Sequence, residues 1–118
     1  MLQLTNKGRT RSALDPRQLT IFTAQLAEQR SFRVEQIHQY ETSSVPLDRP
    51  EAPADEEVRH ALLAGAKTAL AEIEAAQIRV ADGTFGRCVD CRGGVSLERL
   101  EVLPSVARCL TCDRGSRR

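Results

Sequence analysis

The chain has 118 residues, enough for one domain of ordinary size, and a formal net charge of +1. It contains no tryptophan, one tyrosine and three phenylalanines, which excludes a thick aromatic core. No apolar run approaches the roughly 18 residues of a membrane span, and the N-terminus lacks the apolar run of a signal peptide. We therefore expect a soluble, cytoplasmic protein without a membrane segment.

The small net charge conceals two segments of opposite sign. Residues 55–82 carry six acidic and three basic residues, whereas residues 83–118 carry seven arginines and four acidic residues. The acidic segment favours a positively charged partner or channel, because nucleic acid would be attracted to basic surfaces instead.

Residues 1–14 are polar, basic and aperiodic, and we expect a disordered basic arm. Asp15 and Pro16 are typical of a helix start, since Asp caps the helix and Pro fits its first position. Apolar residues then recur at mostly three- and four-residue steps, which predicts a helix over about 16–42 with a seam interrupted around 29–33. The expected seam consists of Leu19, Phe22, Leu26, Val34, Ile37 and Tyr40.

Residues 43–54 contain three prolines and predict a loop. Asp55 is the expected cap of a second helix over 55–82, which Gly83 ends. After Val58, residues at alternating four- and three-residue steps form a heptad seam: Leu62, Ala66, Ala69, Ile73, Ala76 and Val80. We therefore expect residues 15–82 to form an antiparallel helical hairpin with a proline-rich tip.

Two C-x-x-C pairs follow the hairpin: Cys88 with Cys91, and Cys109 with Cys112. The seventeen residues between the pairs fall in the range of a four-cysteine zinc site. Four protein ligands complete the tetrahedron and leave no position for a substrate, so one Zn²⁺ would be structural. The sequence predicts a zinc finger over 83–113 with a short basic tail over 114–118.

The finger has little else to form a core, so the zinc ion is expected to supply much of its folding free energy. Its expected apolar residues are Phe85, Val95, Leu97, Leu100, Val102, Leu103 and Val106. Gly86, Gly93 and Gly94 are expected to give the backbone the freedom that the zinc knuckle needs. Four thiolates and one Zn²⁺ would leave the finger only faintly basic, so no sequence-specific DNA binding is expected.

Other uses of the cysteines remain open but are disfavoured. Two disulfides would need an oxidising compartment, a redox C-x-x-C would need a βαβ pattern, and an iron–sulfur cluster is chemically possible with four thiolates. His38 and His60 stand on the expected helices, away from any cysteine. The sequence also shows no nucleophile–base arrangement and no phosphate-cradling glycine loop, so we do not expect an enzyme.

The finger segment resembles the DksA/TraR family. Residues 82–91, DGTFGRCVDC, are similar to the family's acidic-Gly-Thr-Phe-Gly-x-C-x-x-C pattern, and residues 95–109 continue it with Arg-Leu-Glu and a proline before the second pair. The resemblance covers about 82–113 and implies a mainly α fold, a coiled-coil hairpin followed by a zinc finger with a short helix. It also implies a transcription regulator that inserts its hairpin tip into the secondary channel of RNA polymerase.

The resemblance also suggests site residues. Asp48 and Arg49 stand where the family has its tip Asp-Arg, so Asp48 is the candidate functional acid. A second tip aspartate of the family falls at Val45 and a tip alanine at Pro50, and Glu51 is a substitute candidate. Arg99, on the short finger helix, is a further candidate for contacting the polymerase.

The positions that help the family hold the alarmone ppGpp fall at Glu72, Leu103 and Asp113, none of which can pair with a polyphosphate as Lys or Arg does. The resemblance therefore does not extend to ppGpp binding. The alternative function is a zinc-stabilised coiled-coil module that binds another protein or DNA.

Overall fold

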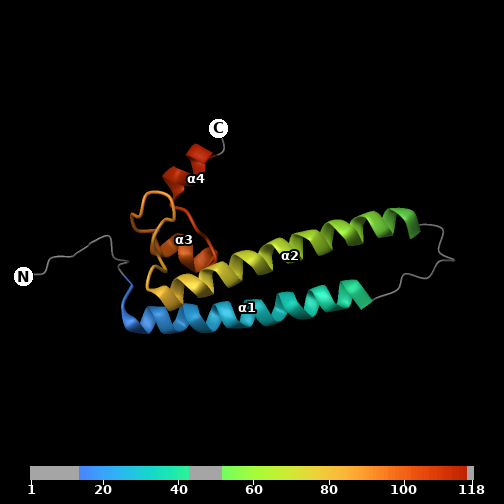
Figure 1. The fold of residues 1–118 in the computed structure, drawn as a ribbon, viewed down its shortest axis with the longest axis horizontal. Helices are drawn as coiled ribbons and strands as arrows, with labels where there is room; N and C mark the ends of the chain where they lie inside the picture. Colours follow the sequence, from blue (N-terminus) through green and yellow to red (C-terminus); the bar gives the residue numbers. More distant parts are fainter. Residues whose placement is uncertain (1–13, 43–51, 117–118) are drawn as a thin grey trace, which may run out of the picture.

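Two long helices lie side by side and antiparallel, and a small finger sits at the end where the first helix begins and the second ends (Figure 1). The structure is a computed structural model that describes residues 14–42 and 52–116, the side chains of 52–55 and 116 excepted. Helix α1 spans Pro16–Thr42, α2 spans Ala52–Asp82, α3 spans Leu97–Val102 and α4 spans Leu110–Ser116. This arrangement confirms the predicted fold class of a helical hairpin followed by a four-cysteine finger.

The start of α1 follows from a reciprocal cap. Gln18 donates its backbone N–H to Asp15 Oδ1 over 2.8 Å, and Asp15 donates its own N–H to Gln18 Oε1 over 3.0 Å. Two N–H groups that the helix leaves without partners are thereby satisfied, as in a capping box. The expected capping role of Asp15 is confirmed.

Helix α2 begins three residues before its expected start. Pro53 lies in the first turn, where its missing N–H would have no partner in any case. Asp55 therefore lies inside the helix, and its expected place as the cap was wrong. At the other end, Gly83 has a φ of +84°, while Thr84 N–H donates to the carbonyl of Arg79 and Gly83 N–H to that of Val80. This pattern is a Schellman ending, which needs glycine for its left-handed residue.

The seam of α1 does not stop where the apolar pattern stops. Val34, expected in the seam, is 42 % exposed, whereas Gln29, Arg33 and Gln36 are half-buried. These three residues continue the three–four spacing of the first seam residues without a break. The middle of the hairpin is thus polar on the α1 side.

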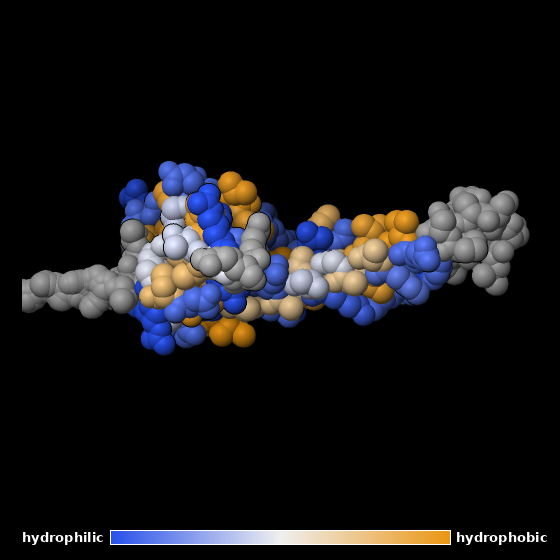
Figure 2. All heavy atoms as spheres, turned by 90° about the horizontal axis from the view of Figure 1, so that it is seen from above, coloured by the Kyte–Doolittle hydropathy of each residue, from blue (hydrophilic) through white to orange (hydrophobic). Residues whose placement is uncertain are grey.

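The seam of α2 differs from the prediction at its distal end, the end next to residues 43–51. Val58 and Leu62 are 58 % and 50 % exposed, and Arg59 and Leu63 are half-buried instead. Nearer the finger, Ala66, Ile73 and Ala76 are buried as expected. The shift by one position leaves apolar residues on the surface near the distal end (Figure 2).

The main core lies where the hairpin meets the finger rather than along the hairpin. It joins buried residues from α1, α2 and the finger: Phe22, Leu26, Ile73, Ala76, Phe85, Cys88, Val95 and Leu100. The rings of Phe22 and Phe85 lie 5.7 Å apart between centroids, in a tilted arrangement favourable for aromatic pairs. The hairpin and the finger therefore share one core.

Three of the finger's expected core residues lie outside that core. Leu97, Val102 and Leu103 are 37 %, 85 % and 49 % exposed. Helix α3 has only six residues, so it can turn one narrow face inward, and Leu100 occupies that face. None of the described helices is long and apolar enough to cross a membrane.

Candidate metal centre

The two C-x-x-C pairs meet in space although 17 residues separate them. The Sγ atoms of Cys88, Cys91, Cys109 and Cys112 all lie within 4.8 Å of one another. Cys88 is buried against the shared core, whereas Cys91 lies on the exposed side of the cluster. The second pair brackets the start of α4, where Asp113 N–H donates to the carbonyl of Cys109.

The spacing of the sulfur atoms fits a tetrahedral zinc ion. Bonds of about 2.3 Å from zinc to each sulfur place neighbouring sulfurs about 3.8 Å apart. The Sγ atoms of Cys91 and Cys109 lie 3.8 Å apart. This separation is far longer than the roughly 2.0 Å of a disulfide. The geometry matches four separate thiolates around one ion.

Backbone N–H groups support the thiolates. Gly93 N–H donates to Cys91 Sγ over 3.3 Å, and Cys112 N–H donates to Cys109 Sγ over 3.5 Å. Such donors spread the negative charge of the sulfurs and orient them toward a metal. A Cβ on Gly93 would lie 3.4 Å from Cys91 Sγ, in van der Waals contact, so the backbone at Gly93 passes directly beside this sulfur.

Two of the thiols have strongly shifted pKa values. Burial raises the pKa of Cys88, but hydrogen bonds from the backbone of Cys91, Cys109 and Asp90 outweigh it and lower that pKa to about 6. Hydrogen bonds with the thiols of Cys88, Cys109 and Cys91 raise the pKa of Cys112 to about 12. Without a cation the cluster favours one thiolate stabilised by its neighbours, whereas a metal ion allows all four to lose their protons.

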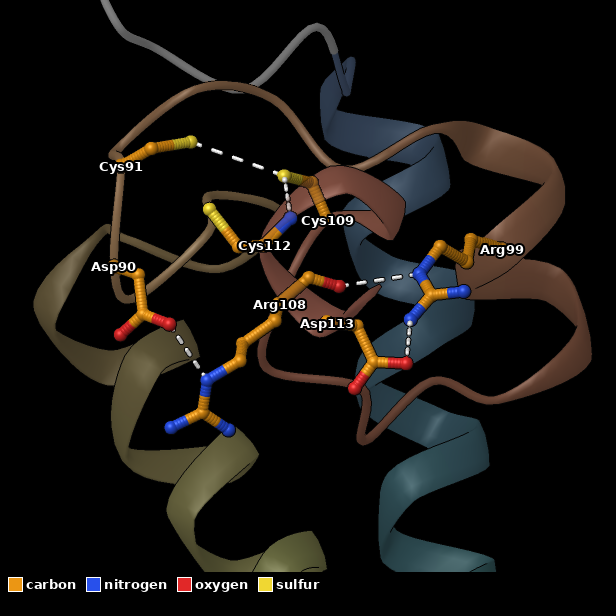
Figure 3. Close-up of polar contacts among 7 residues, drawn as sticks. All are labelled: Asp90, Cys91, Arg99, Arg108, Cys109, Cys112 and Asp113. Atoms are coloured by element: carbon orange, nitrogen blue, oxygen red, sulfur yellow. Dashed lines mark hydrogen bonds and ion pairs between the residues drawn. The ribbon is translucent and has the colours of Figure 1, made fainter. Parts of the chain in front are cut away.

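Charged residues connect the two cysteine pairs around the site (Figure 3). Arg108 donates through Nε to Asp90 Oδ2 over 2.7 Å, which joins the first pair to the chain entering the second. The carboxylate of Asp90 raises the pKa of Arg108. Sequence reasoning missed this ion pair, although Asp90 lies within the first C-x-x-C and Arg108 directly precedes the second.

Arg99 has a structural environment. Its Nε donates to the carbonyl of Arg108 over 3.1 Å, and its Nη2 lies 3.5 Å from Asp113 Oδ2 (Figure 3). The side chain therefore fixes α3 against the second cysteine pair. Its expected contact with a partner stays a prediction. Asp48 and Glu51, the predicted tip acids, lie outside the described residues.

The left-handed residue of the first zinc knuckle is an arginine. Arg92 has a φ of +67°, whereas Gly93 and Gly94, which we expected to supply this freedom, have ordinary negative or extended φ values. Gly86 does adopt a positive φ, of 89°, as expected. An L-residue with a long side chain is strained in this region, and such strain is commonest at functional positions.

Comparison with known proteins agrees with this geometry. Residues 83–118 match the family model described as the prokaryotic dksA/traR C4-type zinc finger. The match covers about the last third of the chain, the segment that holds both cysteine pairs, and this segment is similar to that type of finger. A search among curated proteins finds no match. Among solved structures, the fold resembles that of transcription factor DksA2 from Pseudomonas aeruginosa, with a TM-score of 0.66 and 23 % sequence identity over 87 % of this chain and 85 % of that one.

The DksA/TraR finger accounts for the whole cysteine cluster. A C4-type finger with four clustered sulfurs binds one zinc ion, and all four positions around that ion are taken by protein ligands. A zinc ion at this site is therefore structural. A zinc ion held by these four sulfurs would link the two cysteine pairs next to the shared core, to which Cys88 belongs.

Proposed function

We propose that the protein regulates transcription by binding RNA polymerase, with the distal end of its hairpin inserted into the enzyme's secondary channel. The observation that carries the proposal is the combination of a DksA/TraR finger with a hairpin in one fold. The likeness to a transcription factor extends over both parts, 87 % of this chain and 85 % of the other.

The shape of the hairpin suits insertion into a narrow channel. The 31 residues of α2 span roughly 46 Å at about 1.5 Å per residue. Within residues 14–42 and 52–116, α1 and α2 alone run along this length, so the distal part is thin, while the finger forms a broader base (Figure 1). A base of this kind can rest on the rim of a channel while the helices reach inside.

Polar contacts between the helices hold the hairpin in register. Arg30 pairs with Glu74 over 3.0 Å, and Lys67 pairs with Glu41 over 3.1 Å. Arg59 donates to the carbonyl of Tyr40 over 2.6 Å. Each exposed ion pair contributes only about 0–1 kcal/mol. Because these contacts lie at successive positions along the hairpin, they add to the apolar seam contacts in favouring this alignment of the two helices.

The tip residues of this proposal are Asp48 and Glu51, from the family resemblance. Val58 and Leu62 are exposed close to that end of the hairpin and give it apolar surface for a protein partner. We propose that Asp48 acts on the polymerase while the apolar residues and the finger contribute binding.

We further propose that the protein does not bind ppGpp at the family's alarmone positions. Glu72 and Leu103 line one groove together with Glu28, so the groove presents two carboxylates. Asp113 pairs with Arg99. Carboxylates repel a polyphosphate, and the groove offers it only Arg33 as a cation.

The test is a pull-down with core RNA polymerase combined with transcription in vitro. The Asp48→Asn variant should bind polymerase as the wild type does and lose its effect on transcription. Glu57→Gln is the matched control, since Glu57 is an exposed acid of α2 near the same end. It should retain both properties. If the wild-type protein in excess neither binds core enzyme nor alters transcription from any promoter tested, the proposal is wrong.

The alternative function, a module for another protein or for DNA, makes a different prediction. Duplex DNA would then shift in a gel without polymerase, and the shift would weaken steeply with salt. Such binding together with no polymerase binding would replace the present proposal.

A further inference from the structure

Three arginines converge on one pocket where α2 meets the finger. Arg79 comes from the last turn of α2, Arg87 precedes the first zinc ligand, and Arg92 follows the first cysteine pair. They line a cavity of about 320 Å³ together with Thr84, Cys88 and Val89. This volume lies at the lower end of the range of about 300–1,000 Å³ for small-molecule sites.

The pocket presents positive charge without a lining carboxylate. Two acids stand close in sequence to the lining residues. Asp82 acts electrostatically on Arg79, and its Oδ1 accepts the N–H and the hydroxyl of Thr84 over 3.1 and 2.6 Å. Asp90, two residues before Arg92, pairs with Arg108 over 2.7 Å. Arg79 itself is held in place, since its Nη2 donates to the carbonyls of Ser105 and Val106 over 3.4 and 3.3 Å.

Arg87 and Arg92 have side-chain hydrogen-bond donors that could bind a ligand. Arg87 Nε is buried and has no hydrogen-bond partner among the residues that the structure describes. A buried donor left without an acceptor is unfavourable, so this atom favours a ligand that brings one. Arg92 is exposed, and no hydrogen bond or ion pair of its side chain occurs within residues 14–42 and 52–116.

The backbone of Arg92 gives a second, independent indication. Its φ of +67° is the one positive value at a non-glycine residue in the described part of the chain. A glycine would occupy this position without strain. Strain retained at a charged residue that lines a pocket is best explained by a use for the charge.

We propose that this pocket binds a small phosphate-bearing anion, with Arg79, Arg87 and Arg92 as its ligands. Guanidinium groups match the oxygens of a phosphoryl group with paired donors, and three of them suit a doubly or more highly charged anion. The cavity is large enough for one or two phosphoryl groups. The phosphate can come from a free small molecule or from a nucleic-acid backbone, and the limited, concave volume favours the free molecule.

A structural reading of the arginines makes a different prediction. Zinc with four thiolates carries a net charge of about −2, and Cys88 lines the pocket. If the arginines serve only to balance this charge, their removal should weaken zinc retention and should not affect a separate anion. Zinc content and anion binding must therefore be measured together.

The experiment is a calorimetric titration of the zinc-loaded full chain with inorganic pyrophosphate at low ionic strength, without divalent cations beyond the bound zinc. The variants are Arg87→Gln and Arg92→Gln. The matched control is Arg114→Gln, an exposed arginine of α4 outside the pocket. We expect saturable binding by the wild type and the control, at least a tenfold weaker affinity in each pocket variant, and full zinc content in all four proteins.

Three results would overturn the proposal. These are no saturable binding of pyrophosphate by the wild type, an equal loss of affinity in the Arg114 control, or loss of zinc with unchanged pyrophosphate affinity in the pocket variants. A parallel titration with a short DNA duplex separates the two phosphate sources. If the duplex binds and pyrophosphate neither binds nor competes with it, the result would also contradict a pocket for small anions.

Discussion

Replacing Phe85 by alanine tests whether hairpin and finger share one core. Its side chain is 3 % exposed and contacts the ring of Phe22 on α1. A buried phenylalanine covers about 150–250 Å², which at about 25 cal/mol per Å² corresponds to roughly 4–6 kcal/mol of transfer free energy. Alanine keeps a small part of this contribution, so the expected loss of unfolding free energy is about 3–5 kcal/mol.

The assay is thermal and urea unfolding of the zinc-loaded protein, followed by circular dichroism. A loss of about 3 kcal/mol should lower the melting temperature by roughly 12 °C or more in a domain of this size. Phe32→Ala is the matched control, because Phe32 is 61 % exposed and lies beside Arg33, whose guanidinium carbon is 5.6 Å from the ring centroid. This control should lose no more than about 1 kcal/mol. Equal losses in the two variants would refute the shared core.

Four further substitutions test three local features by the same unfolding assay. Asp15→Ala removes the cap of α1 and should cost about 1 kcal/mol; an unchanged midpoint would contradict the capping box. Leu62→Gln should lower the free energy of unfolding by less than about 0.5 kcal/mol and Leu63→Gln by more than about 1 kcal/mol, because only Leu63 lies in the seam. The reverse order would support the seam predicted from the sequence, with Leu62 buried. Arg92→Gly should raise the free energy of unfolding by up to about 1 kcal/mol. Relief of the left-handed strain gains about 1–2 kcal/mol, which exceeds the cost of about 0.4–1 kcal/mol from the added conformational entropy of the unfolded chain. A lower free energy of unfolding would show that the side chain contributes to folding.

The features that the sequence predicted are those coded over a few neighbouring residues. The spacing of the cysteines, the cap at Asp15 and the stop at Gly83 each depend on local chemistry, and the structure places all of them as expected. The zinc site could be predicted for the same reason, because two residues between cysteines allow one turn to present both sulfurs.

The register of the hairpin was not predictable in the same way. Alanines recur on several faces of α2, so Leu62 and Leu63 could each fit an apolar seam. The choice depends on the partner helix, where polar Gln29 and Gln36 occupy seam positions that an apolar pattern cannot identify. Pairing across helices, rather than periodicity within one, decides which face is buried.

The arginine pocket is a second feature that could not be predicted from the sequence. Its residues come from the end of α2 and from both sides of the first cysteine pair, and only the fold brings them together. The sequence predicted backbone freedom at Gly86, Gly93 and Gly94. Gly86 has a positive φ, but after the first cysteine pair the positive φ falls on Arg92, one residue before Gly93. The sequence pattern does not specify which residue of the knuckle takes this conformation.

The central claim, that one zinc ion organises the finger beneath the shared core, is tested most directly by metal analysis before and after chelation. We predict one zinc per chain in freshly purified, reduced protein. Its removal should abolish the dispersed NMR signals of residues 83–113 and weaken the amide protection around Phe22 and Leu26. Substoichiometric zinc, or a finger whose spectrum survives chelation unchanged, would contradict the account.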